Sequence, residues 1–386
     1  MNERVRTVVD TARWNGSLLL LVTVQVLIFA GVKLQLCAME PSNEIERDGV
    51  NPRHSSLVLS LDFSRNGKYL ATASYDGQVI IWDTATGAYI RSFFPNGSGT
   101  DIVRFCPTGK EVLVAGSASG MTVWDMKAVK EPGIYYEPRI FDYWTYCAEY
   151  DNSGNRIIFG RTLGFRAKAF VIDSRTGEPL RPLTRLPWEH HGAVADVACG
   201  PDGKKFYSAS HDGTIREWRM TDGQTTRQFE KIDGQLRRMA LSPKGEIAAF
   251  CKEGEESRTI FIWDVESGKL KKKLVQPDAK IFDLIYSPNG RFIITGNRDG
   301  HVIIWDVEAG KQIRSFYANV GEVCCIAISP DARLLAIGGQ DHTVRVWDLK
   351  AEKEIYMLGT AAPLPPDAPG RDDAKDGIKQ QGRESN

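Results

Sequence analysis

A tryptophan recurs along the chain at a nearly fixed interval, and this repeat restricts the possible folds more than any other feature of the sequence. Six of the nine tryptophans follow a short apolar run and precede a turn. They are Trp82, Trp124, Trp218, Trp263, Trp305 and Trp347. The intervals between them are 42, 94, 45, 42 and 42 residues, and Ile172 takes the place of tryptophan near the middle of the long interval. Seven units with a period of about 40 to 45 residues indicate a repeat architecture.

Each unit has the pattern of four short strands separated by turns. In the first unit, residues 57–64 alternate apolar and polar side chains, as a half-buried strand does. Residues 69–74, 78–82 and 88–94 are the further strands, and Asp76-Gly77 suits a tight turn between the second and the third. The turn residues return in most later units, and no segment of this region has a sustained helical period. Four-stranded units repeated radially predict a propeller.

The region from residue 54 to residue 358 resembles the WD-repeat β-propeller family in its period, its Trp-Asp strand ends and its turns. The resemblance implies an all-β fold, a seven-bladed β-propeller of four-stranded antiparallel blades. We expect residues 353–358 to supply the last strand and close the ring, with residues 43–50 as a competing candidate.

In this family a hydrogen-bonded set of four side chains, His, Ser or Thr, Asp and Trp, holds each blade together; we call it the tetrad. The resemblance implies complete tetrads in the first and fourth blades, where His191 is a rival of His190, and partial ones in the sixth and seventh. The residues are His54, Thr72, Asp76 and Trp82; His190, Ser208, Asp212 and Trp218; Thr295, Asp299 and Trp305; and Asp341 and Trp347. Because a buried imidazole and carboxylate need partners, we interpret the set as structural rather than catalytic.

The two ends of the chain differ in composition from the repeats. Residues 18–32 are almost wholly apolar and follow three arginines, which predicts a signal peptide or membrane anchor within residues 1–38 and a linker at 39–53. We expect this segment to anchor or export the protein, with the propeller outside the cytoplasm. Translation from Met39 would instead make the protein cytoplasmic. Residues 359–386 are rich in proline and charge and are expected to be disordered.

The composition gives no sign of catalysis or of binding to nucleic acid. Lys plus Arg and Asp plus Glu both number 49, so no net charge draws the chain toward nucleic acid. We interpret the lysines between residues 269 and 273 as protection of a sheet edge. The chain has no nucleophile, phosphate-loop or paired-cysteine motif, and its cysteines are expected to be buried and unpaired. We therefore expect no metal and no cofactor.

The resemblance implies a non-catalytic scaffold that binds a protein or peptide, as a monomeric propeller within a complex. In the family, the residue before the tetrad aspartate points toward the binding face. Aromatic residues of the third blade, which lacks the tetrad, either fill its core or anchor a partner. The alternative is a propeller enzyme, lactonase-like or with a quinone cofactor, although we expect no cluster of Asp, Glu or His at the centre of the ring. The candidate partner-binding residues are Tyr75, His211, Arg298, Gln340, Tyr143 and Trp144.

Overall fold

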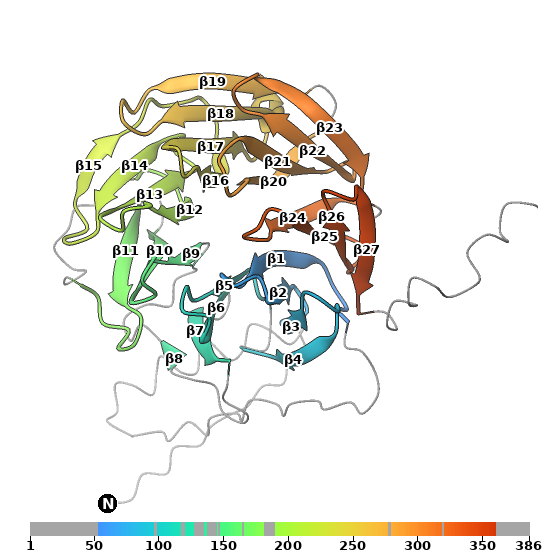
Figure 1. Cartoon of the computed structure of the whole chain (residues 1–386). Coiled ribbons are helices and arrows are strands. Elements are labelled where there is room, and N and C mark those ends of the chain that lie inside the picture. The colour runs from blue at the N-terminus through green and yellow to red at the C-terminus, as the bar shows by residue number, and fades with distance from the viewer. Residues whose placement is uncertain are drawn as a thin grey trace, which may run out of the picture. The chain divides into compact units, whose positions relative to one another are not determined.

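Antiparallel strands make up almost all of the computed structural model, which describes residues 53–359 except 96–98, 117–119, 127–134, 137–144, 146, 164–165, 181–189, 277–278 and 319. Its 27 strands form seven sheets around a common axis (Figure 1). The described residues contain no helix apart from one 3-10 turn, Glu255–Arg258. The predicted seven-bladed β-propeller is confirmed.

The first four blades follow one another along the chain. Blade one consists of β1 (Val58–Phe63), β2 (Tyr69–Ser74), β3 (Val79–Asp83) and β4 (Tyr89–Phe93). Blade two consists of β5 (Ile102–Phe105), β6 (Glu111–Gly116), β7 (Gly120–Asp125) and β8 (Tyr135–Tyr136). Blade three consists of β9 (Ala148–Tyr150), β10 (Arg156–Leu163) and β11 (Arg166–Asp173), with a bridge between Ile172 and Pro179 at its outer edge. Blade four consists of β12 (Val194–Cys199), β13 (Lys205–Ser210), β14 (Ile215–Arg219) and β15 (Thr225–Gln228).

The last three blades complete the circle. Blade five consists of β16 (Leu236–Leu241), β17 (Glu246–Cys251), β18 (Thr259–Asp264) and β19 (Leu270–Val275). Blade six consists of β20 (Ile281–Tyr286), β21 (Phe292–Asn297), β22 (His301–Asp306) and β23 (Lys311–Tyr317). Blade seven consists of β24 (Val323–Ile328), β25 (Leu334–Gly339), β26 (Val344–Asp348) and β27 (Lys353–Leu358).

The order of the strands defines two ends of the ring. In every sheet the strands pair in chain order, and the first strand lies nearest the axis (Figure 1). Because neighbouring strands are antiparallel, the turns between second and third strands lie at the same end as the links between blades. We call this end the top face. The turns between first and second strands lie at the opposite end, the bottom face.

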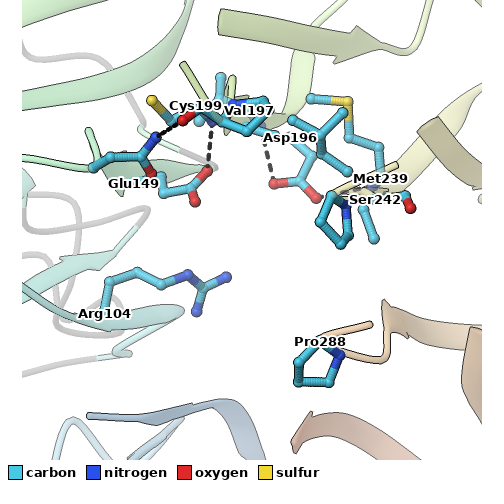
Figure 2. Close-up of a pocket in the computed structure, with 14 residues that line it drawn as sticks. Arg104, Glu149, Asp196, Val197, Cys199, Met239, Ser242 and Pro288 are labelled. Atoms are coloured by element: carbon cyan, nitrogen blue, oxygen red, sulfur yellow. Dashed lines mark hydrogen bonds between the residues drawn. The ribbon is translucent and has the colours of Figure 1, made fainter. Parts of the chain in front are cut away.

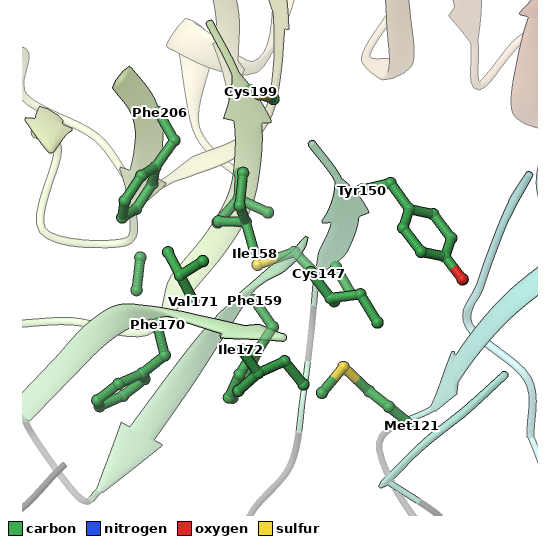
Figure 3. Packing of buried hydrophobic residues seen from close by; sticks show 14 of the residues in the cluster. Met121, Cys147, Tyr150, Ile158, Phe159, Phe170, Val171, Ile172, Cys199 and Phe206 are labelled. Carbon is green, nitrogen blue, oxygen red and sulfur yellow. The ribbon is translucent and has the colours of Figure 1, made fainter. Parts of the chain in front are cut away.

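Apolar side chains fill the space between neighbouring blades. Blade three, where Ile172 replaces the tryptophan, shows this most clearly (Figure 3). Its buried residues form one cluster with Met121 of blade two and Phe206 of blade four. Among the aromatic residues at positions 135–150, Tyr150 is the one whose side chain is described, and it is buried in this cluster. That ring therefore fills the core of the blade.

The last strand closes the ring as predicted. β27 pairs with β26 from Leu358 opposite Val344 to Lys353 opposite Asp348. β24 packs against β1, and the thiol sulfur of Cys325 lies 3.3 Å from the carbonyl oxygen of Val58. Each end blade is thus built from one continuous part of the chain. The competing segment, residues 43–50, lies outside the described residues.

A repeated polar contact joins the outer edges of neighbouring blades. A side chain on the outermost strand of one blade donates to the backbone carbonyl of the residue two positions after the tryptophan of the next blade. We call this hydrogen bond the rim clamp. Tyr356 on β27 makes this contact with the carbonyl of Thr84 and so ties the last blade to the first. The other clamps join Arg91 to Met126 (3.3 Å), Arg227 to Val265 (2.9 Å), Lys272 to Val307 (2.6 Å) and Arg314 to Leu349 (3.3 Å).

The clamp at the closure predicts a measurable contribution to stability. Tyr356→Phe removes only the hydroxyl and leaves the half-buried carbonyl of Thr84 without this donor. We expect the free energy of unfolding to fall by about 1 kcal/mol in urea titrations followed by tryptophan fluorescence. The matched control is Tyr317→Phe on β23, whose ring is 48% exposed. An equal effect of the two substitutions would contradict a specific role for the closing clamp.

The membrane-anchored or exported location predicted from the N-terminal segment is wrong for the part of the chain that the structure describes. No helix there is long and apolar enough to cross a membrane. The apolar run that prompted the prediction, residues 18–32, lies outside the described residues, and so does most of the proline-rich tail, residues 360–386.

Candidate functional site

The tetrad of blade four is a continuous hydrogen-bonded chain that ends at the top face. Trp218 Nε1 donates to Ser208 Oγ at 2.7 Å, and Ser208 Oγ lies 2.8 Å from His190 Nε2. His190 Nδ1 lies 3.1 Å from Asp212 Oδ2. His190 rather than His191 therefore occupies the tetrad position. The backbone N–H of His191 donates to the same carboxylate at 2.9 Å.

Each side chain of this tetrad has a hydrogen-bond partner. The imidazole of His190 can accept the serine hydroxyl at Nε2 and donate its Nδ1–H to Asp212. Burial alone would raise the pKa of Asp212, but hydrogen bonds from His190 and Thr214 outweigh burial and hold the pKa below its usual range. The carboxylate is thus ionised and links the turn after β13 to the link before β12.

Blade one repeats this arrangement with threonine in place of serine. Trp82 Nε1 donates to Thr72 Oγ1 at 3.1 Å, and Thr72 Oγ1 lies 2.7 Å from His54 Nε2. His54 Nδ1 lies 3.3 Å from Asp76 Oδ2, which also accepts the backbone N–H of Ser55 at 2.7 Å. Both imidazoles are buried, and each lies within hydrogen-bond distance of a hydroxyl and a carboxylate of its own blade.

The partial tetrads hold their blades less completely. In blade six Trp305 Nε1 donates to Thr295 Oγ1 at 3.4 Å, while Asp299 faces His301 at 3.2 Å. Among the described residues, Asp341 of blade seven accepts only from Thr343 on its own turn, at 3.0 Å for the backbone N–H. The indole nitrogen of Trp347 has no hydrogen-bond partner among the described residues.

Four of the predicted partner-binding residues occupy equivalent places on the top face. Each follows the second strand of its blade, and its backbone N–H donates to the carbonyl of a residue just before the first strand. Tyr75 is the most prominent, because 63% of its surface is exposed. Tyr143 and Trp144 lie outside the described residues. The backbone pairs are Tyr75 with Leu57 (2.9 Å), His211 with Ala193 (2.9 Å), Arg298 with Lys280 (2.9 Å) and Gln340 with Glu322 (3.0 Å).

The sequence prediction missed a fifth member of this set. Lys252 follows β17, and its backbone N–H donates to the carbonyl of Gln235 at 2.7 Å, as at the other four positions. Burial and then the positive charge of Lys252 lower the pKa of His211, so these two residues face a common surface. Blade five has no aspartate at the turn, which is why a search guided by that residue passed over Lys252. We call Tyr75, His211, Lys252, Arg298 and Gln340 the top-face set.

Carboxyl groups gather near the axis of the ring, where we expected none. They belong to Asp62, Glu149, Asp196 and Asp283, all on first strands, and we call them the axial carboxyls. Each accepts a backbone N–H from the first strand of the next blade. The bonds reach Phe105 (2.6 Å), Cys199 (3.2 Å), Met239 (2.9 Å) and Ile326 (2.9 Å), respectively.

These bonds solve a problem that the propeller creates at its centre. Each first strand is the inner edge of its sheet. The N–H groups on its side toward the axis of the ring therefore have no neighbouring strand to pair with. The axial carboxyls supply acceptors from the preceding blade. An aligned reading of the seven units could have found them, because Asp196 and Asp283 share one register of the first strand and Asp62 and Glu149 another.

Burial makes the axial carboxyls weak acids. It raises the pKa of Asp62 to about 6 and that of Glu149 to about 8, against the opposing influence of Arg104. It also raises the pKa of Asp196 and of Asp283, which Arg238 opposes. The two arginines do not fully compensate four buried acids. Among the described residues, no three or more His, Cys, Asp or Glu side chains are grouped so that they could hold a metal ion.

A cavity of about 370 Å³ opens beside these groups at the bottom face. Arg104 lies on one side of it and Glu149 with Asp196 on the other (Figure 2). The turns between first and second strands form its rim through Pro201, Pro243 and Pro288.

The comparison with known families agrees with the geometry of the blades. The family model described as "WD domain, G-beta repeat" matches residues 49–83, 180–219, 268–306 and 310–348. These segments include the tryptophan-bearing strands of blades one, four, six and seven. The chain is a WD-repeat β-propeller protein. The remaining blades, two, three and five, lack the tetrad aspartate.

The propeller is similar to several curated proteins of this family. Its match to "WD repeat-containing protein 90" of Homo sapiens is 24% identical over 250 residues. This match covers 60% of this chain and 13% of that protein. It is 25% identical over 219 residues to "THO complex subunit 3" of Arabidopsis thaliana, covering 57% of this chain and 61% of that one. A "Guanine nucleotide-binding protein subunit beta" of Oryza sativa subsp. japonica is 22% identical over 262 residues, covering 64% and 67%. The match thus spans less than two thirds of the first two relatives.

The described cysteines and two lysines of the basic outer strand have the surroundings that we interpret as structural. All six described cysteines are free, and five of them are buried, as predicted. Burial raises the pKa of the Cys251 thiol to about 12. On β19, Lys271 pairs with Glu246 at 2.6 Å and Lys272 forms a rim clamp, so these lysines contact the protein itself.

Proposed function

We propose that this propeller is a scaffold that binds a protein or peptide through the top-face set. The observation that supports this most directly is the alignment of five side chains at one position of five blades, each held by the same backbone hydrogen bond. The backbone is fixed while the side chains project, which lowers the entropic cost of binding.

The chemistry of the set suits a polar peptide with one apolar anchor. Tyr75 supplies a large, exposed ring, and aromatic residues with arginine dominate the binding energy of interfaces. Arg298 is held by Glu322, whose carboxylate lies 3.0 Å from Arg298 Nε, so its orientation is set before a partner arrives. Two relatives are named as subunits of complexes, which supports a partner-binding role for this chain.

The test is a double substitution on the top face. Tyr75→Ala with Arg298→Ala should weaken partner capture at least tenfold in quantitative pull-downs, because both anchors are removed. The melting temperature should change little, since both side chains are largely exposed.

The matched control replaces exposed residues on the outer rim, Ile313→Ala with Lys311→Ala. Ile313 is 49% exposed and lies on β23 near the bottom face, away from the top face. Capture by this control should equal that of the wild type. If the top-face double variant also captures the partner normally, the top-face proposal is rejected.

A further inference from the structure

The cavity at the bottom face has an unusual electrostatic feature. A guanidinium and a carboxyl group stand on opposite sides of it, and no ion pair joins them among the described residues (Figure 2). Arg104 Nη1 is bonded to Ser60 Oγ at 3.0 Å and to its neighbour's carbonyl, at Val103, at 2.8 Å. Among the described residues, no hydrogen bond is made by the remaining nitrogens of this guanidinium.

The carboxyl group across the cavity is also half used. Glu149 Oε2 accepts the N–H of Cys199 at 3.2 Å, and Glu149 Oε1 has no hydrogen bond to any described residue. Asp196, beside it, is different, because Oδ1 accepts the N–H of Val197 at 3.0 Å and Oδ2 that of Met239 at 2.9 Å. Among the described charged or ionisable side chains that line the cavity, the polar atoms without a hydrogen bond are therefore on one edge of Arg104 and at one oxygen of Glu149.

A guanidinium and a carboxyl group that are not fully hydrogen-bonded and are held apart by the backbone are complementary to a molecule that carries a carboxylate and an ammonium group. From these contacts we propose that the bottom-face cavity binds a small zwitterion of the α-amino-acid class. Its ammonium group contacts Glu149, and its carboxylate contacts Arg104, which can hold a carboxylate through two N–H donors. This inference is independent of the partner-binding role of the top face.

The size and the wall of the cavity fit such a ligand. About 370 Å³ lies at the lower end of the range for small-molecule sites, roughly 300 to 1,000 Å³. Val197, Met239 and Pro288 give the wall an apolar part that can receive a short side chain (Figure 2). Burial raises the pKa of Glu149 to about 8, so near neutral pH this carboxyl releases its proton when the ammonium group binds.

The test is calorimetric titration of the full chain with each natural L-amino acid in turn. We expect at least one to bind saturably with a Kd in the millimolar range or below. Its amide, which keeps only the ammonium, and its N-acetyl derivative, which keeps only the carboxylate, should each bind at least tenfold more weakly. Glu149→Gln and Arg104→Gln should each weaken the free amino acid at least tenfold, with folding checked by circular dichroism.

The control is Glu266→Gln, an exposed glutamate on a turn of the same face, which should bind as the wild type does. Three results would overturn the proposal. They are saturable binding by no amino acid, equal binding of the amide and the free acid, and equal binding by wild type and Glu149→Gln. If Arg104→Gln fails to fold, Glu149→Gln alone decides, because it keeps the shape of the side chain.

Discussion

Asp212→Ala should lower the free energy of unfolding by about 3 kcal/mol, whereas Asp341→Ala should lower it by less than about 1 kcal/mol. Both aspartates occupy the same position of the turn between second and third strands. Asp212 Oδ2 accepts from His190 and from the backbone of His191, and its other oxygen accepts the backbone N–H of Thr214 at 2.9 Å. Removing it takes the carboxylate away from a buried imidazole and leaves only the hydroxyl of Thr214, 3.1 Å from His190 Nδ1, near that nitrogen.

Blade seven provides the matched control within the same molecule. Asp341 is exposed and accepts only from Thr343 on its own turn, so its removal leaves no buried group unpaired. Urea unfolding of the two variants under identical conditions measures the difference. Equal destabilisation would mean that the turn itself, and not the tetrad, carries the effect.

Blade one allows an independent check of the same idea. His54→Ala should cost a similar amount, because Thr72 Oγ1 and Asp76 both lose a partner inside the blade. His191→Ala should change the stability little, since only its backbone N–H contacts Asp212. A tetrad histidine, His54, and the rival histidine of blade four, His191, are therefore distinguishable by stability alone.

The fold could be predicted from the sequence because the same local pattern is repeated. Every blade must bury a similar inner surface, so one tryptophan position recurs and fixes the count of units even where Ile172 replaces it. The closing strand could also be predicted, since residues 353–358 have a more hydrophobic pattern than the competing residues 43–50. β27 then pairs directly with β26.

The centre of the ring could not be predicted in the same way. A polar residue on a half-buried strand, such as Glu149, is usually interpreted as facing solvent. Its actual neighbours, Arg104 and Asp196, lie on the first strands of other blades, and only closure of the ring brings them together. Lys252 was missed for a related reason, because the turn that identifies its position has lost the aspartate in blade five.

The axial carboxyls predict that the propeller becomes less stable as the pH rises from about 5 to about 9. Burial raises the pKa of Glu149 from 4.5 to about 8, so between these values the folded protein holds a proton that the unfolded chain has released. Stability falls with pH wherever the folded state binds more protons. The neighbouring groups that face Glu149 are Arg104, which opposes the shift, and Asp62 and Asp196, which reinforce it.

Glu149→Gln tests this directly, because glutamine has the shape of the protonated acid and no proton to lose. The wild type should lose on the order of 2 kcal/mol of its free energy of unfolding between pH 5 and pH 9, and the variant should lose clearly less. Urea titrations at pH 5, 7 and 9 measure both slopes, with Glu266→Gln as an exposed control that should follow the wild type.

Below pH 4 the stability is expected to fall for a different reason, the protonation of tetrad aspartates. Hydrogen bonds to histidine lower the pKa of Asp212 and that of Asp76, although burial alone would raise both. Both proteins should therefore lose stability together as the acid protonates those two tetrads, so that the effect of Glu149 is confined to the alkaline side. A variant with the same alkaline slope as the wild type would show that Glu149 is not the group that holds the proton.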